Sequence, residues 1–279
     1  MKVAALQYKY DFLPSFGAYR KKITALVEHH YHKQVSLLLL PEYAGLEMLS
    51  FASIDTIDEH LENYLGLFQE LSSKYHMYIC SGSHVVLDGV KRYNRAYLFS
   101  PTGNIGFQDK CNITPFEHEE GLVSPADTLK VFDTKYGKIA ICICYDIEFP
   151  FLVSKLVHAG AQVILVPSYT ASYHGFYRVF VSCRARALEH QIYIVQSPLI
   201  GQTDVEIAYG SASICTPIDQ GFPEDGILAL GPKDQQYSIE RTLDFSKTAN
   251  IKTKGETRNY LDQLDLEKRI LSVHLANLM

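Results

Sequence analysis

The chain has 279 residues, of which 47% are hydrophobic, and no Pro/Gly/Ser-rich linker or charge run divides it, so we expect one domain over residues 1–279. The net charge of −5 argues against a nucleic-acid partner, and the apolar segments are shorter than the roughly 20 residues that a membrane helix requires. Six scattered cysteines and an N-terminus without a signal-peptide pattern favour a cytoplasmic protein with reduced thiols.

Strands and amphipathic helices alternate through the first half of the chain. Hydrophobic periodicity and turn residues predict strands over 2–8, 35–40, 77–84, 94–100 and 103–109, and helices over 16–32 and 58–74. Two of these strands end on a charged residue. Glu42 follows the apolar run of residues 36–40, and Lys110 ends the segment of residues 105–110.

The second half continues the alternation and contains an apolar run that ends in a cysteine. We expect helices near 148–159 and 175–190, and strands over 162–166, 192–196, 210–216, 227–231 and 236–243. Residues 138–143 fit a strand buried on both faces, which delivers Cys144 into the polar sequence Tyr145-Asp146. Ligands in open α/β sheets gather beyond the carboxyl ends of such strands, so Cys144 is a candidate site residue. A buried cysteine more often serves only as a small hydrophobic residue. We favour a functional role for Cys144 because Glu42 and Lys110 also follow predicted strands.

Glu42, Lys110 and Cys144 are the three residue types that a thiol-based nucleophilic mechanism needs. A carboxylate can take the thiol proton, the thiolate can attack a carbonyl carbon, and an ammonium group can stabilise the oxyanion that forms. Free cysteine is mostly protonated at neutral pH, so a cysteine nucleophile depends on such neighbours. The sequence shows no paired Cys motifs or histidines at ligand spacing, and its glycines form no phosphate-binding pattern, so we expect neither a metal nor a cofactor.

The chain resembles the nitrilase superfamily of carbon–nitrogen hydrolases. The resemblance extends over nearly the whole chain. It rests on segments that occur in the family's order: Lys2-Val3-Ala4-Ala5-Leu6-Gln7, Leu40-Pro41-Glu42, Lys110, Cys144-Tyr145-Asp146, Val166-Pro167-Ser168, and Arg186-Ala187-Leu188-Glu189-His190-Gln191. It implies an α/β fold in the form of a four-layer αββα sandwich, commonly paired into a homodimer or a higher homo-oligomer.

The resemblance also implies a role for each residue of the triad. Glu42 would be the general base, Lys110 the oxyanion stabiliser and Cys144 the nucleophile, with the backbone amide of Tyr145 as a second oxyanion donor. The implied activity is that of an amidase, which cleaves a small amide to a carboxylic acid and ammonia through a cysteine thioester.

The family carries a second glutamate after the lysine, and the sequence offers two positions for it. Glu117 follows Thr-Pro-Phe, which resembles one family pattern, whereas Glu119 has the better spacing to Ser124-Pro125-Ala126-Asp127. We favour Glu119 narrowly. Both lie in a charged stretch in which most carboxylates are simply solvated, so only one of them need be functional.

The substrate is less well defined than the triad. Tyr145-Asp146 resembles the amidase-like branches, whereas nitrilases usually have Trp-Glu there, so we expect an amide substrate bound near Ser168, Tyr169 and Thr170. Glu148 replaces the family's usual Arg, which puts a carboxylate-binding role of that position in doubt. The alternatives are a nitrilase, an N-carbamoyl amidohydrolase, an acyltransferase to an amine, and a non-catalytic scaffold.

Overall fold

The computed structural model describes residues 1–53, 56–269 and 272, so the C-terminal end of the expected 1–279 domain lies outside the described residues. The strands are β1 (Lys2–Lys9), β2 (Leu37–Leu39), β3 (Tyr78–Asp88), β4 (Lys91–Phe99), β5 (Ile105–Asp109), β6 (Val131–Thr134), β7 (Gly137–Ile141), β8 (Val163–Ser168), β9 (Tyr193–Gln202), β10 (Ile207–Ala208), β11 (Ser213–Cys215), β12 (Ile227–Leu230) and β13 (Tyr237–Thr242). The α-helices are α1 (Phe16–His32), α2 (Leu61–Lys74), α3 (Pro115–Glu119), α4 (Pro150–His158), α5 (Tyr173–His190), α6 (Phe245–Lys254) and α7 (Asn259–Glu267), with 3₁₀ helices η1 (Ala44–Ser50), η2 (Ile57–His60) and η3 (Cys144–Glu148).

The strands form two sheets that β1 connects. The strand order is β5-β4-β3-β2-β1-β9-β8-β7-β6, with β13 beside β1, β11 between β9 and β12, and β10 against β9. The middle of β1 pairs with β2 in parallel, whereas its last residues, Tyr8 and Lys9, pair with β9 in the other sheet. One strand therefore fixes how the two sheets are placed relative to each other.

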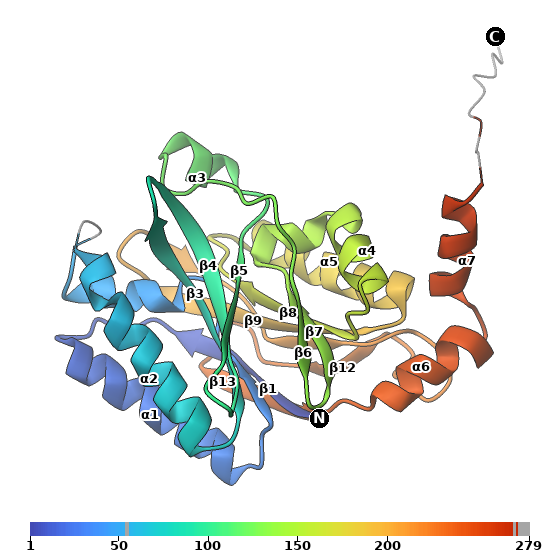
Figure 1. Ribbon diagram of the computed structural model, residues 1–279, viewed down its shortest axis with the longest axis horizontal. Helices are drawn as coiled ribbons and strands as arrows, with labels where there is room; N and C mark the ends of the chain where they lie inside the picture. Colours follow the sequence, from blue (N-terminus) through green and yellow to red (C-terminus); the bar gives the residue numbers. More distant parts are fainter. Residues whose placement is uncertain (54–55, 270–271, 273–279) are drawn as a thin grey trace.

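Helices cover the outer face of each sheet, which gives the four layers (Figure 1). Ala4 and Leu6 of β1 share a core cluster with Ile23 of α1 and Phe68 of α2. The alternate β1 residues belong to a second cluster, which runs from β1, β2 and β3 through β7 and β8 to α4 and α5. This alternation is what a strand buried on both faces requires. The expected four-layer αββα sandwich is confirmed.

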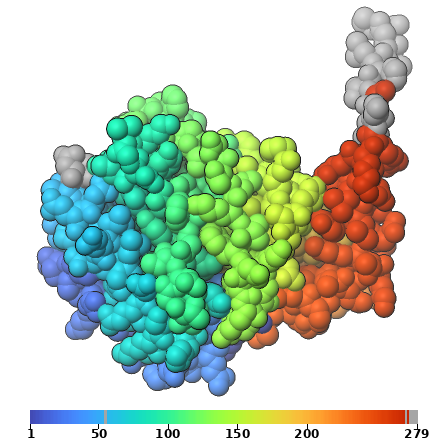
Figure 2. All heavy atoms as spheres, in the orientation of Figure 1, coloured from blue at the N-terminus to red at the C-terminus, as the bar shows by residue number. Residues whose placement is uncertain are grey.

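Five of the strands and α-helices were not predicted, namely α3, β6, β10, α6 and α7. The helix α3 has only five residues, β6 is a four-residue strand that pairs with β7 alone, and none of the residues of α7 is buried. Elements this short or this exposed leave little hydrophobic periodicity in the sequence. The helices α6 and α7 lie beside the sandwich at its edge and not over the sheets (Figures 1 and 2).

No helix in the described part of the chain combines the length and apolarity that crossing a lipid bilayer requires.

Candidate active site

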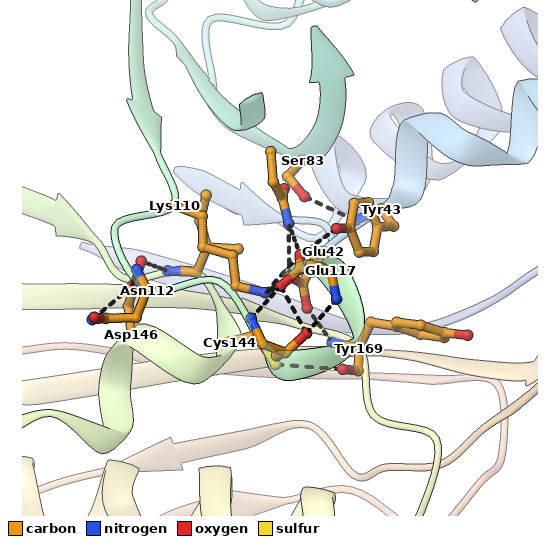
Figure 3. A network of polar contacts seen from close by, with 12 residues as sticks. Glu42, Tyr43, Ser83, Lys110, Asn112, Glu117, Cys144, Asp146 and Tyr169 are labelled. Carbon is orange, nitrogen blue, oxygen red and sulfur yellow. Dashed lines mark hydrogen bonds and ion pairs between the residues drawn. The ribbon is translucent and has the colours of Figure 1, made fainter. Parts of the chain in front are cut away.

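The site forms where three strands of the same direction end. The strands β3, β2, β1, β9, β8 and β7 all run in the same direction. Two antiparallel pairings, β3 with β4 and β4 with β5, turn β5 back to that direction. The carboxyl ends of β2, β5 and β7 therefore lie at one edge of the sandwich. Glu42, Lys110 and Cys144 follow these three strands, and Figure 3 shows their side chains pointing toward one another.

Glu42 is buried and both of its carboxylate oxygens accept hydrogen bonds. Its Oε1 accepts from Lys110 Nζ at 2.8 Å and from Asn94 Nδ2 at 2.8 Å, while its Oε2 accepts from the backbone N–H of Tyr169 at 2.9 Å. The adjacent strand β3 approaches so closely that a Cβ at Gly82 would lie 1.9 Å from the carbonyl oxygen of Pro41. A glycine at this position, with φ +71°, lets β3 hold the segment that carries Glu42.

Lys110 lies between two carboxylates in the interior of the protein. Its Nζ donates to Glu42 Oε1 at 2.8 Å and to Glu117 Oε2 at 2.8 Å, and all three side chains are at most 4% exposed. Burial alone would lower the pKa of Lys110, but pairing with the carboxylates of Glu42 and Glu117 outweighs it and raises the pKa above its ordinary value. Lys110 is therefore charged, and its ammonium group donates to Glu42 Oε1 and to both carboxylate oxygens of Glu117.

The second glutamate in the site is Glu117, which corrects the preference for Glu119. The side chain of Thr114 accepts from the backbone N–H of Glu117, and the Glu117 carboxylate accepts from the backbone N–H of Thr114 at 2.7 Å. This capping box at the start of α3 turns Glu117 inward onto Lys110, whereas Glu119 is exposed to solvent two residues later. Burial would raise the pKa of Glu117, but the Lys110 ammonium outweighs it and lowers that pKa.

Cys144 is the first residue of the 3₁₀ helix η3, which follows β7, and it lies in a left-handed backbone conformation with φ +47°. A non-glycine residue in this conformation is strained, and strained residues of this kind are common at active sites. The thiol is 5% exposed, and its Sγ lies 3.4 Å from the carbonyl oxygen of Tyr169. The sharp turn therefore places the sulfur beside the backbone of Tyr169, as Figure 3 shows.

Burial and the neighbouring carboxylate determine the protonation of the thiol. Burial raises the pKa of Cys144, and the negative charge of Glu42 raises it further, so the thiol is protonated at neutral pH. Burial likewise raises the pKa of Glu42, although the positive charge of Lys110 opposes this. A carboxylate of raised pKa beside a protonated thiol can accept its proton when a substrate carbonyl arrives, and Lys110 can then stabilise negative charge.

Two other predicted site residues, Tyr145 and Tyr169, offer backbone groups to the site. Tyr145 follows Cys144 in the first turn of η3, where backbone N–H groups have no partner within the helix. Tyr169 contributes its backbone, since its N–H donates to Glu42 and its carbonyl accepts from Cys144.

Ser168 and Thr170, expected to line the pocket, have side chains bonded elsewhere. The hydroxyl of Ser168 is buried against the backbone of Ser197, and that of Thr170 donates to the carbonyl of Tyr209 at 2.9 Å. Ser168 is the last residue of β8, and its side chain packs against the neighbouring strand β9 and not into the site.

Two residues of the polar network were not singled out from the sequence. Asn94 Nδ2 donates to Glu42 and also to Glu117 Oε1 at 3.3 Å, and the hydroxyl of Tyr43 donates to Glu117. Asn94 lies on the same buried face of β4 as Ala96. A polar amide at a position where the strand alternation predicts a buried residue was the signal in the sequence for Asn94. Tyr43 gave no such signal.

The site has no set of ligands for a metal ion. In the part of the chain that the structure describes, no group of three or more His, Cys, Asp or Glu side chains is arranged to bind one. The Glu42 and Glu117 carboxylates are instead neutralised by Lys110.

Comparison with known proteins gives a consistent result. Residues 2–219 match the family model of carbon–nitrogen hydrolases. The chain is 36% identical over 274 residues to the probable hydrolase YhcX of Bacillus subtilis (strain 168), an alignment that covers 94% of this chain and 53% of that protein. The chain thus spans about half the length of YhcX. It is 29% identical over 189 residues to the omega-amidase NIT2-B of Xenopus laevis, covering 62% of this chain and 67% of that protein.

Among solved structures, Nit3 of Saccharomyces cerevisiae, a member of branch 10 of the nitrilase superfamily, superposes with a TM-score of 0.76 at 24% identity. That superposition covers 90% of this chain and 93% of Nit3, and it confirms the fold.

Proposed function

Because the chain belongs to the carbon–nitrogen hydrolase family, we propose that it cleaves a small linear amide to a carboxylic acid and ammonia through a thioester on Cys144. The observation that carries the proposal is the contact of Lys110 with both Glu42 and Glu117 beside the thiol. The similarity to an omega-amidase supports an amide as the substrate in preference to a nitrile.

In the proposed first step, Glu42 takes the proton of the Cys144 thiol while the sulfur attacks the amide carbonyl carbon. The Lys110 ammonium and the backbone N–H of Tyr145 hold the resulting oxyanion, and one such donor is typically worth about 3 kcal/mol of transition-state stabilisation. Proton transfer within the Glu42–Cys144 pair leaves the net charge of the buried cluster unchanged, which avoids the cost of creating a second buried negative charge.

In the second step, the C–N bond breaks and protonated Glu42 gives its proton to the leaving nitrogen, which departs as ammonia. Glu42 then deprotonates a water molecule, which attacks the thioester carbonyl. The thiolate leaves and regains its proton from Glu42, so the enzyme returns to its starting state. Glu117 stays ionised throughout and holds Lys110 in place.

Ammonia release from a panel of small amides, omega-amides, N-carbamoyl compounds and nitriles tests the proposal, with Cys144→Ala measured beside the wild type. We expect release from an amide class that the variant lacks. Release from nitriles alone would indicate a nitrilase, and a new amide product with added hydroxylamine but no hydrolysis would indicate an acyltransferase. No turnover together with an unreactive thiol would favour a non-catalytic scaffold.

We further propose that the protein forms a homodimer through the outer face of α5. Three apolar or aromatic side chains four residues apart, Tyr173, Tyr177 and Val181, are 43%, 44% and 57% exposed on this helix. Phe151 at the start of neighbouring α4 is 69% exposed. An exposed apolar stripe of this kind is typical of a surface that another protein covers, and a second copy of the chain would bury it.

We also propose that the protein works in the cytoplasm. All six cysteines are free, and most of them are buried. The proposed nucleophile functions only as a reduced thiol, and the cytoplasm keeps thiols in that form. Labelling of the native protein in permeabilised cells with a thiol reagent would test whether Cys144 is reduced there.

A further inference from the structure

Asp146 connects the two segments that carry Lys110 and Cys144. Its Oδ1 accepts from the backbone N–H of Asn112 at 2.7 Å, and its Oδ2 accepts from the backbone N–H of Cys111 at 3.2 Å. Oδ2 also accepts from the backbone N–H of Ile143 at 3.3 Å. Figure 3 shows Asp146 and Asn112 beside the catalytic cluster but directed away from its centre.

These three N–H groups belong to the residues next to Lys110 and Cys144 in the chain. Cys111 and Asn112 directly follow Lys110 after β5, whereas Ile143 directly precedes Cys144 after β7. The strands β5 and β7 belong to the two different sheets that β1 connects and do not pair with each other. No strand pairing therefore aligns the segment after β5 with the segment after β7. The carboxylate of Asp146 joins these two segments by hydrogen bonds to both.

The carboxylate is well suited to this task. Asp146 is 2% exposed, and although burial raises its pKa to about 6 against the hydrogen bonds that it accepts, it is ionised at neutral pH. Charged acceptors form shorter and stronger hydrogen bonds than neutral ones, and a carboxylate offers four lone-pair sites. The charged groups that face it are the Lys110 ammonium and, if deprotonated, the thiols of Cys111 and Cys142.

We propose that Asp146 is a positioning residue whose carboxylate sets the separation of Lys110 from Cys144 by binding the backbone on both sides of the site. The inference rests on the proposed function, in which the Lys110 ammonium must reach the oxyanion that forms at the carbon attacked by Cys144. Asp146 itself does not contact the reacting atoms.

Asp146→Asn isolates this role because it preserves the shape of the side chain. An amide has one oxygen and one NH₂ group, so whichever way it is turned, NH₂ hydrogens face backbone N–H groups that had a carboxylate oxygen. A misplacement of about 1 Å in a catalytic group can cost about 10²-fold in rate. We therefore expect kcat for the amide to fall by about 10²-fold with KM changed by less than about threefold.

The matched control is Asp58→Asn. The Asp58 carboxylate likewise accepts from a backbone N–H, that of Leu87 at 3.2 Å, and pairs with Arg92, but it has no contact with the site. We expect its kcat to stay within about twofold of the wild type, as is usual for substitutions away from a functional site. Equal losses of kcat in the two variants would show general destabilisation and would overturn the inference.

Two readouts need no substrate. The Lys110 ammonium lowers the pKa of the Cys144 thiol, so displacing it in Asp146→Asn should slow alkylation by iodoacetamide at pH 8 by about tenfold. In the wild type, the backbone amides of Cys111 and Asn112 should exchange with deuterium as slowly as those of β5, although they lie beyond the strand. Fast exchange of these amides would overturn the inference even if the variant did not fold.

These readouts separate failure of the positioning role from failure of the proposed function. If the wild type hydrolyses no amide, the proposed function fails, and alkylation and exchange still judge the role of Asp146. If the wild type is active and Asp146→Asn retains its kcat and its alkylation rate, the positioning role is wrong and the proposed function stands.

Discussion

Glu117→Gln tests the assignment that the structure changed. The carboxylate of Glu117 accepts from Lys110 Nζ through both oxygens, at 3.0 and 2.8 Å, and also from Thr114 and Tyr43. Glutamine keeps the size and one acceptor oxygen but removes the negative charge and turns an NH₂ group toward these donors. Lys110 would then have Glu42 as its only carboxylate partner.

The magnitude follows from the burial of the pair. Removing one partner of a buried ion pair costs about 3–5 kcal/mol, and since Lys110 retains Glu42, we expect the lower end, about 3 kcal/mol of unfolding free energy. Loss of one of the two anchors of the ammonium should lower kcat by about 10²-fold. Burial and the charge of Glu117 both raise the pKa of Glu42, so the acid limb of the pH–rate profile should move to lower pH.

Urea unfolding and amide turnover over pH 4–9 are the assays for this variant, with Glu119→Gln as the control. Glu119 is exposed, so its variant should change the unfolding free energy by no more than about 0.5 kcal/mol and leave kcat as in the wild type. A loss of activity in Glu119→Gln with an unaffected Glu117→Gln would refute the reasoning.

Two further predictions concern stability and assembly. Burial lowers the pKa of His84 to about 4, below the ordinary value of 6.5. As the pH falls from 6.5 to 4, His84 is therefore protonated in the unfolded chain but stays neutral in the folded protein. The His84 contribution to the unfolding free energy, present above pH 6.5, should fall by about 3 kcal/mol at pH 4, and urea titrations of His84→Gln should lack this component; an identical pH dependence would contradict the prediction. The double variant Tyr177→Glu with Val181→Glu should elute as a monomer in size-exclusion chromatography with an unchanged circular dichroism spectrum, and an unchanged elution volume would place the interface elsewhere.

The hydrophobic pattern of the sequence predicted the buried strands but not the exposed helix α7. The strand β2 and the last three residues of β7 form continuous apolar runs because both of their faces are buried in the sandwich. The helix α7 has no buried residue, so no apolar stripe marks it in the sequence. The periodicity thus reflects burial, and elements that bury little escape it.

The same contrast applies within the site. The positions of Glu42, Lys110 and Cys144 follow from strand direction, because each residue comes just after a strand that ends at the same edge. Spacing to a downstream motif could not distinguish Glu117 from Glu119, because the capping box of α3 decides which carboxylate turns inward. The Thr-x-x-Glu spacing from Thr114 to Glu117 was the signal in the sequence for that outcome.

Trapping the acyl-enzyme tests the central claim most directly. The wild type is mixed with an amide that it hydrolyses, quenched in acid within the first turnovers, and measured by intact and peptide mass spectrometry. The account predicts a mass increase equal to the acyl group minus one hydrogen, located on the peptide that contains Cys144 and absent from Cys144→Ala. An acyl group on another residue, or continued turnover in Cys144→Ala, would contradict it.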